Sequence, residues 1–470
     1  MPFYGSLAII QAEIQQSNLS CVSLVRHYLA NINNNKHLNA FIEVFEEEAL
    51  AKAVEVDNKI ATKTSGKLAG LVVGIKDLIC YKDHQVNAAS KMLDGFYSLY
   101  TATAVQKLID EDAIIIGRQN CDEFGMGSSS ETSIYGAVKN GLNSAHVAGG
   151  SSGGSAVAVQ MDMCTVSLGT DTGGSVRQPA AFCGVIGLKP SYSRISRTGL
   201  TSYASSFDTI GIISNSIDDN EKVLAIIAGS DNSDSTSSAK SYEIAQAEQV
   251  SAKKFCYYQD LLSLGVASDV ANAFNTLIDQ LKRQGHIVEP VAFPWQDYAL
   301  PAYYLLTMAE ASSNLSRYDG LRYGHRAATS ATFNELYAQS RSEGFGQEVK
   351  RRILLGTFIL STGYYDAYVA KAQKLRSLIR DYTLNLFDQY DFLLSPTAPT
   401  AAFEIGKKRE NPVEMYLEDL FTVQASLAGI PAISIPFKEK INNLPIGLQI
   451  SANEFHENSL YSIAQHIIDL

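Results

Sequence analysis

Two Gly-Gly-Ser turns contain the residue types most suited to chemistry. The first spans 149–155, and the second lies within the segment 169–177. Glycines let backbone N–H groups converge on one point, which suits an oxyanion that forms on a carbonyl carbon beside a serine. The pattern predicts Ser175 as a nucleophile. The predicted oxyanion hole consists of the backbone N–H groups of Thr172, Gly173, Gly174 and Ser175.

A serine hydroxyl needs a base, and the eight histidines form no HxxxH or HExxH pattern that would indicate one. Lys76 is the candidate because it ends the apolar run 71–75. Burial can lower a lysine pKa from about 10.4 to roughly 7 or 8, which makes the neutral amine available. Ser151 could then relay the proton from Ser175. From the residues alone, Lys76 is equally typical of a strand-end lysine paired with Asp77.

Three other interpretations of the Gly/Ser region fit less well. A phosphate cradle lacks the Gly-Lys-Ser/Thr ending of a P-loop. The G-x-S-x-G pattern of 150–154 would make Ser152 the nucleophile of an α/β-hydrolase, but no strand precedes it. A flexible linker would not carry apolar segments such as 156–159 and 164–168 at short intervals.

The elements that position these residues can be read from apolar patterns. Runs at 71–75 and 113–117 predict strands, and the helical pattern at 102–110 between them predicts a parallel α/β sheet. Residues 6–60 predict two or three helices. Further helices are expected at about 269–283, 301–316, 331–342 and 346–387, and strands at 286–293, 391–394 and 432–436.

Composition restricts the classes of partner. The net charge is −11 and no long Lys/Arg run exists, so this chain alone should not bind nucleic acid strongly. The six cysteines are scattered without a CxxC pair, which favours free thiols in a reducing compartment and gives no zinc pattern. No uninterrupted stretch of 18 apolar residues is present, so we expect a cytoplasmic protein with no membrane partner and no metal site.

Three motifs in order, 74–77, 149–155 and 169–180, resemble those of the amidase signature family. The resemblance implies an α/β fold, an α/β/α sandwich around a central mixed β-sheet. It also implies a Ser-cisSer-Lys triad, which maps onto Ser175, Ser151 and Lys76, with Ser151 after a cis peptide bond.

Segments 122–129, 310–317, 341–346 and 349–376 are similar to one branch of that family, the A subunits of glutamyl-tRNA(Gln)/aspartyl-tRNA(Asn) amidotransferases. That branch hydrolyses glutamine to glutamate and ammonia. The resemblance implies that Arg352 and Asp419 face the α-carboxylate and α-ammonium of glutamine, with Tyr303 nearby. Without it, Arg352 would be interpreted as a surface helix arginine and Asp419 as a helix charge.

The same resemblance implies the cofactors and partners. No cofactor is expected in this chain, and ATP and Mg would be used at a partner B subunit, which accepts the ammonia for Glu-tRNA(Gln). A small C subunit would brace the complex. The whole chain, 1–470, is expected to form a single amidase domain, with a catalytic core at about 65–215, an exposed loop at about 229–247 and a substrate-side helical part at about 300–425.

Two other functions stay open on the sequence. One is a stand-alone amidase that acts on small amides without partners. The other is a non-catalytic scaffold that uses the Gly-rich turns to bind an anion. The chain also departs from the usual family motifs at Gly125, Gly141 and Ala148, all beside the predicted site.

Overall fold

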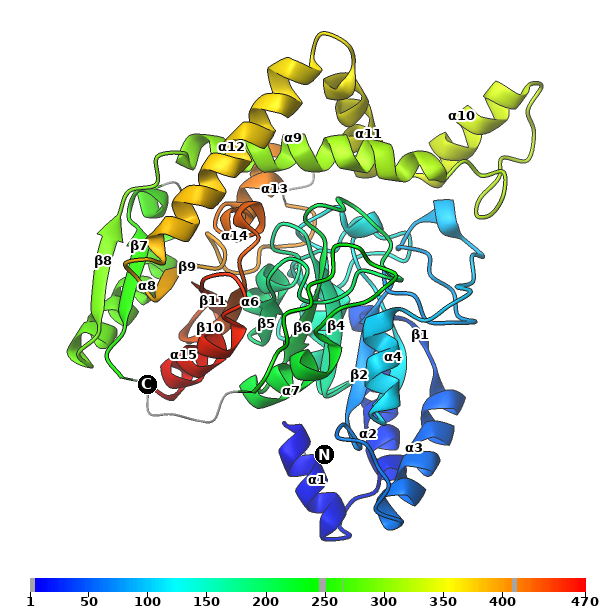
Figure 1. The fold of residues 1–470 in the computed structure, drawn as a ribbon. Coiled ribbons are helices and arrows are strands. Elements are labelled where there is room, and N and C mark those ends of the chain that lie inside the picture. Colours follow the sequence, from blue (N-terminus) through cyan, green and yellow to red (C-terminus); the bar gives the residue numbers. More distant parts are fainter. Residues whose placement is uncertain (1–4, 245–250, 264, 408–411) are drawn as a thin grey trace.

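An eleven-stranded sheet runs through the molecule (Figure 1). The computed structural model describes residues 5–244, 251–263, 265–407 and 412–470. In sheet order the strands are β1 (Phe41–Val44), β3 (Ile114–Gln119), β2 (Val72–Lys76), β4 (Val166–Asp171), β6 (Thr209–Ser214), β5 (Ile186–Lys189), β10 (Ala432–Ile441), β11 (Leu444–Ser451), β9 (Phe392–Pro396), β7 (Lys254–Tyr258) and β8 (Ile287–Val291). Parallel pairs β2–β3, β2–β4, β7–β8 and β7–β9 are combined with antiparallel ones, so the sheet is mixed, as predicted.

The central strands are buried on both faces. Val72 and Ile114 pack in one hydrophobic cluster, whereas their chain neighbours Val73 and Ile115 pack in another on the opposite face. A strand covered on both sides has no polar face, so its sequence is a continuous apolar run. This burial explains why the strands at 71–75 and 113–117 could be predicted.

Helices cover the two faces of the sheet. One face packs mainly against α2 (Cys21–Asn34), α3 (Glu46–Ala61), α5 (Gly153–Gln160) and α6 (Arg177–Cys183). The other packs against α4 (Thr103–Asp110), α7 (Ile217–Ile227), α8 (Ser268–Arg283) and α15 (Glu457–Asp469). Helix α1 (Leu7–Gln15) contributes to both clusters, through Leu7 to one and Ile10 to the other. The α/β/α sandwich is therefore confirmed.

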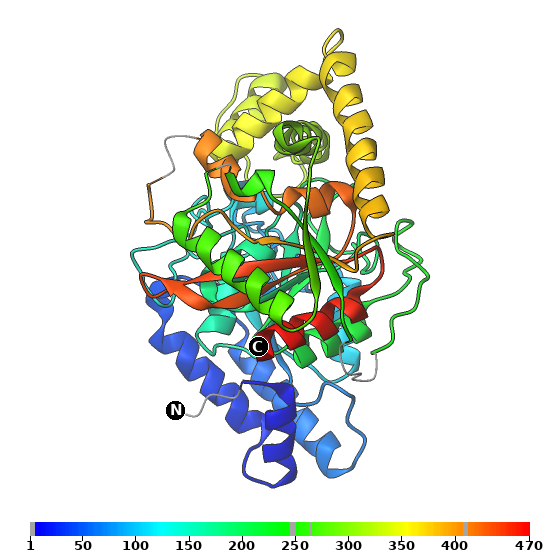
Figure 2. The same ribbon diagram turned by 90° about the vertical axis from the view of Figure 1, so that its left-hand side faces the viewer.

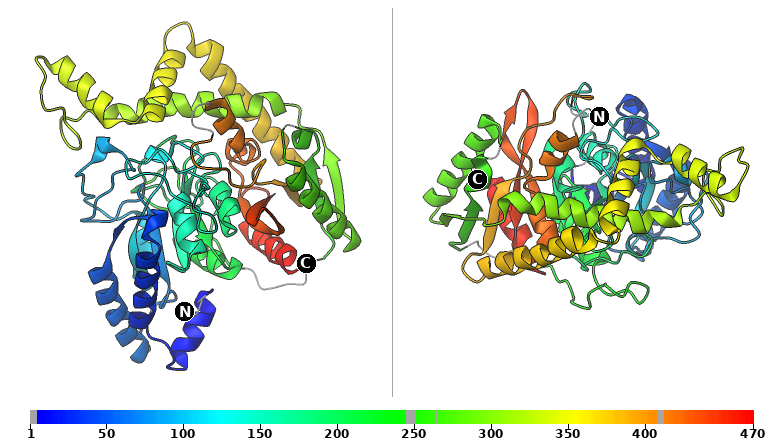
Figure 3. Two further views of the ribbon diagram at one scale, coloured as in Figure 1. Left: turned by 180° about the vertical axis from the view of Figure 1, so that it is seen from behind. Right: turned by 90° about the horizontal axis from the view of Figure 1, so that it is seen from above.

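A further group of helices lies above the strand ends (Figure 2). It comprises α9 (Gln296–Asn314), α10 (Phe333–Gly344), α11 (Gln347–Leu360), α12 (Tyr365–Leu386), α13 (Pro412–Tyr416) and α14 (Val423–Ala428). The prediction of one helix over 346–387 was wrong. Ser361 is extended (ψ 156°) and Gly363 has φ +92°, so the chain turns there and α11 and α12 are separate helices. Figure 3 shows α10 extending away from the sheet.

Three further features bear on the sequence predictions. All six cysteines are free and buried. Residues 229–244 of the predicted exposed loop are tied to the body in part, because Asp231 accepts hydrogen bonds from Thr103 and Ser196 (2.6 Å each), whereas 245–247 lie outside the described residues. Among the described helices, none is both long and apolar enough to cross a membrane.

Candidate active site

The candidate site begins where two parallel strands end. Lys76 is the last residue of β2, and Asp171 is the last of β4, the strand paired with it. Parallel neighbours place their carboxyl ends at one edge of the sheet, so residues 95 positions apart in the sequence come together. The Lys76 Nζ donates hydrogen bonds to three hydroxyls, those of Ser151 (2.7 Å), Ser152 (2.9 Å) and Thr170 (2.8 Å).

Lys76 has the environment of a base. Its side chain is fully buried, and this burial lowers the pKa of the amine to about 8, against the opposing effect of charges such as Asp122 and Asp171. It is not a strand-end lysine paired with Asp77, because the Asp77 carboxylate pairs instead with Arg118 at 2.6 Å. An amine in this state can accept a proton near neutral pH.

The two serines of the predicted triad lie on adjoining turns. The Gly150–Ser151 peptide bond is cis, as the resemblance implied. The Ser152 N–H donates to the Ser175 carbonyl (3.1 Å), which holds the two turns together. Among the described residues, no hydrogen bond directly joins the hydroxyls of Ser151 and Ser175. Transfer of a proton between these two hydroxyls therefore stays a prediction, and such bonds often tighten only when substrate binds.

Ser152 is poorly placed to be a nucleophile. Its hydroxyl donates to the Thr170 carbonyl (3.1 Å) and accepts from the Lys76 amine and the Thr170 N–H (3.2 Å). The side chain is fully buried within this network. Ser175, by contrast, keeps 9% of its surface exposed. The geometry therefore favours Ser175 over the α/β-hydrolase interpretation.

A buried ion pair shapes the turn that carries Ser175. Asp171 pairs with Arg177 (2.8 Å) and accepts hydrogen bonds from the N–H groups of Gly174 (2.9 Å) and Val176 (3.1 Å). The Gly174 N–H is thus directed at Asp171 and is not available to the predicted oxyanion hole. Of the four predicted oxyanion donors, the N–H groups of Thr172, Gly173 and Ser175 stay as candidates.

Arg352 lies on α11 with its guanidinium held in a fixed orientation. Its Nε donates to Glu348 (2.8 Å) and its Nη1 to the Tyr203 hydroxyl (2.8 Å). The guanidinium carbon is 5.5 Å from the ring centroids of Tyr203, Tyr304 and Tyr416. The side chain is only 4% exposed, so it is not a surface helix charge. Such an oriented guanidinium suits a carboxylate ligand.

Asp419 and Tyr303 lie between this arginine and the turn that carries Ser175. Asp419 accepts hydrogen bonds from Ser128 (2.9 Å) and from the Tyr304 hydroxyl (2.6 Å), and burial raises the pKa of its carboxyl to about 7. The Tyr303 hydroxyl packs so closely against Gly173 that a Cβ added there would collide with it. The predicted clamp residues and the predicted nucleophile therefore share one region.

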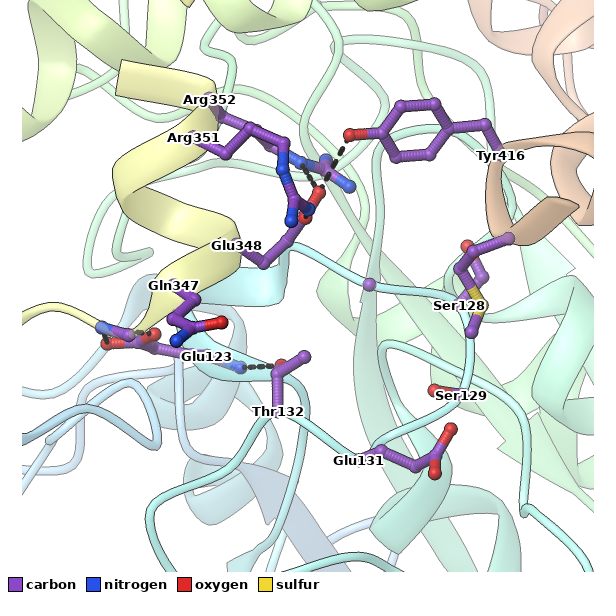
Figure 4. A pocket seen from close by; sticks show the side chains of 13 residues that line it. Glu123, Ser128, Ser129, Glu131, Thr132, Gln347, Glu348, Arg351, Arg352 and Tyr416 are labelled. Carbon is purple, nitrogen blue, oxygen red and sulfur yellow. Dashed lines mark hydrogen bonds and ion pairs between the residues drawn. The ribbon is translucent and has the colours of Figure 1, made fainter. Parts of the chain in front are cut away.

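A cavity of about 310 Å³ opens between the start of α11 and the loop that carries Ser128 (Figure 4). Arg352, Glu348 and Tyr416 line one side, and Ser128, Ser129 and Glu131 line the other. Sequence reasoning did not single out several residues that hold the site together, namely Ser128, Thr170, Tyr203, Tyr304, Glu348 and Tyr416. Ser128 lay within the family motif 122–129, but the aromatic residues carried no pattern of their own. Within the described ranges, no group of three or more His, Cys, Asp or Glu side chains could hold a metal ion.

Comparison with known proteins agrees with this fold. The family model described as Amidase matches residues 23–461. The chain therefore belongs to the amidase family and is an amidohydrolase.

Particular relatives are similar over nearly the whole chain. The A subunit of glutamyl-tRNA(Gln) amidotransferase from Chlorobium phaeobacteroides (strain BS1) is 45% identical over 474 residues, covering 99% of this chain and 98% of the relative. The protein of the same name from Neisseria meningitidis serogroup A is 45% identical over 458 residues, covering 97% and 95%. The crystal structure of the corresponding protein from Thermotoga maritima has a TM-score of 0.78 and 37% identity, covering 94% of this chain and 90% of that one.

Proposed function

We propose that this chain is the glutaminase subunit of a tRNA-dependent amidotransferase that converts Glu-tRNA(Gln) to Gln-tRNA(Gln). The observation that carries the proposal is a buried arginine and a buried carboxyl, Arg352 and Asp419, beside a Ser-Ser-Lys cluster. These two charges match the carboxylate and ammonium of a free amino acid. The 45% identity to subunits of that name supports the same substrate.

The chemistry follows from the roles proposed for each residue. Ser175 Oγ attacks the side-chain amide carbon of glutamine while its proton passes through Ser151 to the neutral Lys76 amine. The oxyanion is stabilised by the backbone N–H groups of Thr172, Gly173 and Ser175. The proton returns to the leaving nitrogen, ammonia departs, and water then cleaves the γ-glutamyl ester to release glutamate.

The remaining steps belong to partners. We propose that a B subunit uses ATP and Mg to activate Glu-tRNA(Gln) and accepts the ammonia, and that a C subunit braces the complex. The acidic net charge of −11 supports the proposal that the partner subunit, and not this chain, binds tRNA. We also propose that the chain acts as one amidase domain, with a core at 65–215 and a substrate-side helical part at 300–425.

The test is an ammonia-release assay on the chain purified together with its partner subunits. Glutamine should be hydrolysed in preference to benzamide, and Arg352→Ala should remove that preference. Efficient hydrolysis of benzamide with no turnover of glutamine would instead identify a stand-alone amidase. A folded wild-type sample whose Ser175 is not labelled by a serine-reactive phosphonate would support the anion-binding scaffold.

A further inference from the structure

Two neighbouring acids in the motif 122–129 reach in different directions. Asp122 accepts hydrogen bonds from the Ser130 N–H (2.8 Å) and the Thr132 hydroxyl (2.9 Å), on the loop that carries Ser128. Its own N–H donates to the Ser151 carbonyl (3.2 Å). Asp122 therefore connects the catalytic turn to the Ser128 side of the clamp. Glu123 reaches the other side, and none of the roles proposed above explains it.

Glu123 binds the start of α11. The Gly346 N–H donates to both of its carboxylate oxygens, at 3.0 and 2.9 Å, and the Ser90 hydroxyl donates to one of them at 2.5 Å. Gly346 is the N-cap residue of α11 and has no side chain that could cap the helix. A carboxylate at this position satisfies a free helix N–H and interacts favourably with the helix dipole. Glu123 thus acts as the cap from another part of the chain.

The contact between Glu123 and Gly346 is tight as well as buried. Glu123 is 1% exposed, and a Cβ added at Gly346 would collide with its Oε2. Burial raises the pKa of Glu123 to about 7, and its hydrogen bonds to Ser90 and Gly346 act in the opposite direction. Figure 4 shows the side chain beside the first turn of α11, at the edge of the cavity. Little room exists for α11 to shift without breaking this contact.

The same helix carries the clamp arginine. Arg352 follows Gly346 by six positions, a rise of roughly 9 Å along an α-helix. Glu348, which accepts from the Arg352 Nε, lies in the first turn itself. Because a helix moves as a rigid element, a displacement at Gly346 would be passed to the guanidinium.

We propose that Glu123 is a positioning residue for substrate selection: by capping α11 at Gly346, it holds the Arg352 guanidinium where it can bind the α-carboxylate of the substrate. This inference rests on the proposed function of the clamp. It assigns to Glu123 the discrimination between glutamine and amides that lack the carboxylate. Glu123 contacts no reacting atom and acts only through Arg352.

The test compares two ligands that differ only in the carboxylate, glutamine and 4-aminobutanamide, on the chain purified with its partner subunits. In Glu123→Gln, an amide NH₂ replaces one of the two oxygens that accept from Gly346. The KM for glutamine should rise roughly tenfold, which corresponds to about 1.4 kcal/mol, with kcat nearly unchanged. The inhibition constant of 4-aminobutanamide should change by less than about twofold, because it never uses Arg352. Equal weakening of both ligands would overturn the proposal, as would an unchanged KM.

Two further variants exclude a general loss of stability. Gly346→Ala disturbs the same contact from the helix side and should reproduce the selective rise in KM. Ser20→Ala removes the N-cap hydrogen bond of α2, far from the cavity. It should lower the melting temperature but leave the KM for glutamine and the inhibition constant of 4-aminobutanamide unchanged. If Ser20→Ala also raised the KM for glutamine selectively, loss of any helix cap would produce this effect, and the proposal would be rejected.

A double-mutant cycle tests the route through Arg352. In the Arg352→Ala background, Glu123→Gln should add no further rise in KM. Full additivity would show that Glu123 acts independently of Arg352 and would reject the inference. If the wild-type complex releases no ammonia from glutamine, the proposed function fails first, and that outcome is distinct from any result with Glu123.

Discussion

The proposed catalytic cluster and the proposed amino-acid clamp are built in contrasting ways. Lys76, Ser151 and Ser175 sit on strand ends and tight turns of the central sheet, where short hydroxyl and backbone contacts hold them. Arg352, Asp419 and Tyr303 come from helical segments above the sheet and are held by aromatic rings and long side chains. We infer that the strand ends position the groups that react and that the helices position the groups that bind the substrate. Variants in the two regions should therefore change different kinetic constants.

The largest effect is expected for Ser175→Ala. Removal of the proposed nucleophile should lower kcat for glutamine by roughly 10⁴-fold or more, because no covalent intermediate can form. Single-turnover ammonia release measures it, and co-purification with the partners checks that assembly is intact. Retention of more than about a tenth of the activity would remove Ser175 from the chemistry.

Lys76→Ala should come next, with a fall in kcat of roughly 10³-fold. The three hydroxyls now bonded to the amine would lose their base, while the glutamine clamp stays in place. The KM should therefore change little, as a kcat and KM analysis at neutral pH can show. Substantial turnover in this variant would mean that another group takes the proton.

Arg352→Ala tests the other region. The KM for glutamine should rise roughly 100-fold through loss of a charge-assisted contact with the carboxylate. Neutral butyramide should be affected by less than about threefold. An equal loss for both amides would place Arg352 in the scaffold of the site and erase the contrast between the two regions.

The pH dependence gives the smallest and most specific difference. Burial lowers the pKa of Lys76 to about 8, so hydrolysis of any amide should rise with pH as the neutral amine forms. Burial raises the pKa of Asp419 to about 7, so its carboxylate, needed only for the ammonium, is lost as the pH falls through that value. From about pH 8 to about pH 6 the ratio of kcat/KM for glutamine to that for butyramide should fall roughly tenfold. Asp419→Asn should abolish this change in the ratio, and a constant ratio in the wild type would contradict the assigned role.

The residues alone indicated the proposed catalytic cluster, whereas the proposed clamp came only from the family resemblance, and this difference has a physical reason. Strands buried on both faces leave apolar runs, and the Gly/Ser turns are unusual in composition, so the segments around Lys76 and Ser175 could be recognised locally. The orientation of the Gly174 N–H could not be predicted, because it depends on the ion pair between Asp171 and Arg177 within the folded turn. The clamp joins side chains from α9, α11 and η6 (Leu417–Asp419), and no spacing in the sequence records those contacts.

Secondary structure shows the same limit. The continuous helical pattern at 346–387 hid the turn at Ser361–Gly363, because the polar and apolar periodicity resumes directly after it. Strand β11 was missed although its apolar residues alternate from Leu444 to Ile450, because Pro445 and Gly447, two residue types that are unfavourable inside strands, fall within the run.

The buried cysteines have a practical consequence. Burial raises the pKa of Cys164 and of Cys256 to about 12, and it raises the pKa of the other four as well. Thiolates are the reactive form, so the folded chain should resist maleimide reagents without any cysteine being replaced. A thiol introduced at Leu354, which is 70% exposed on α11, would then be a unique attachment point for a fluorophore. Its emission would show whether α11 keeps its position when glutamine is added.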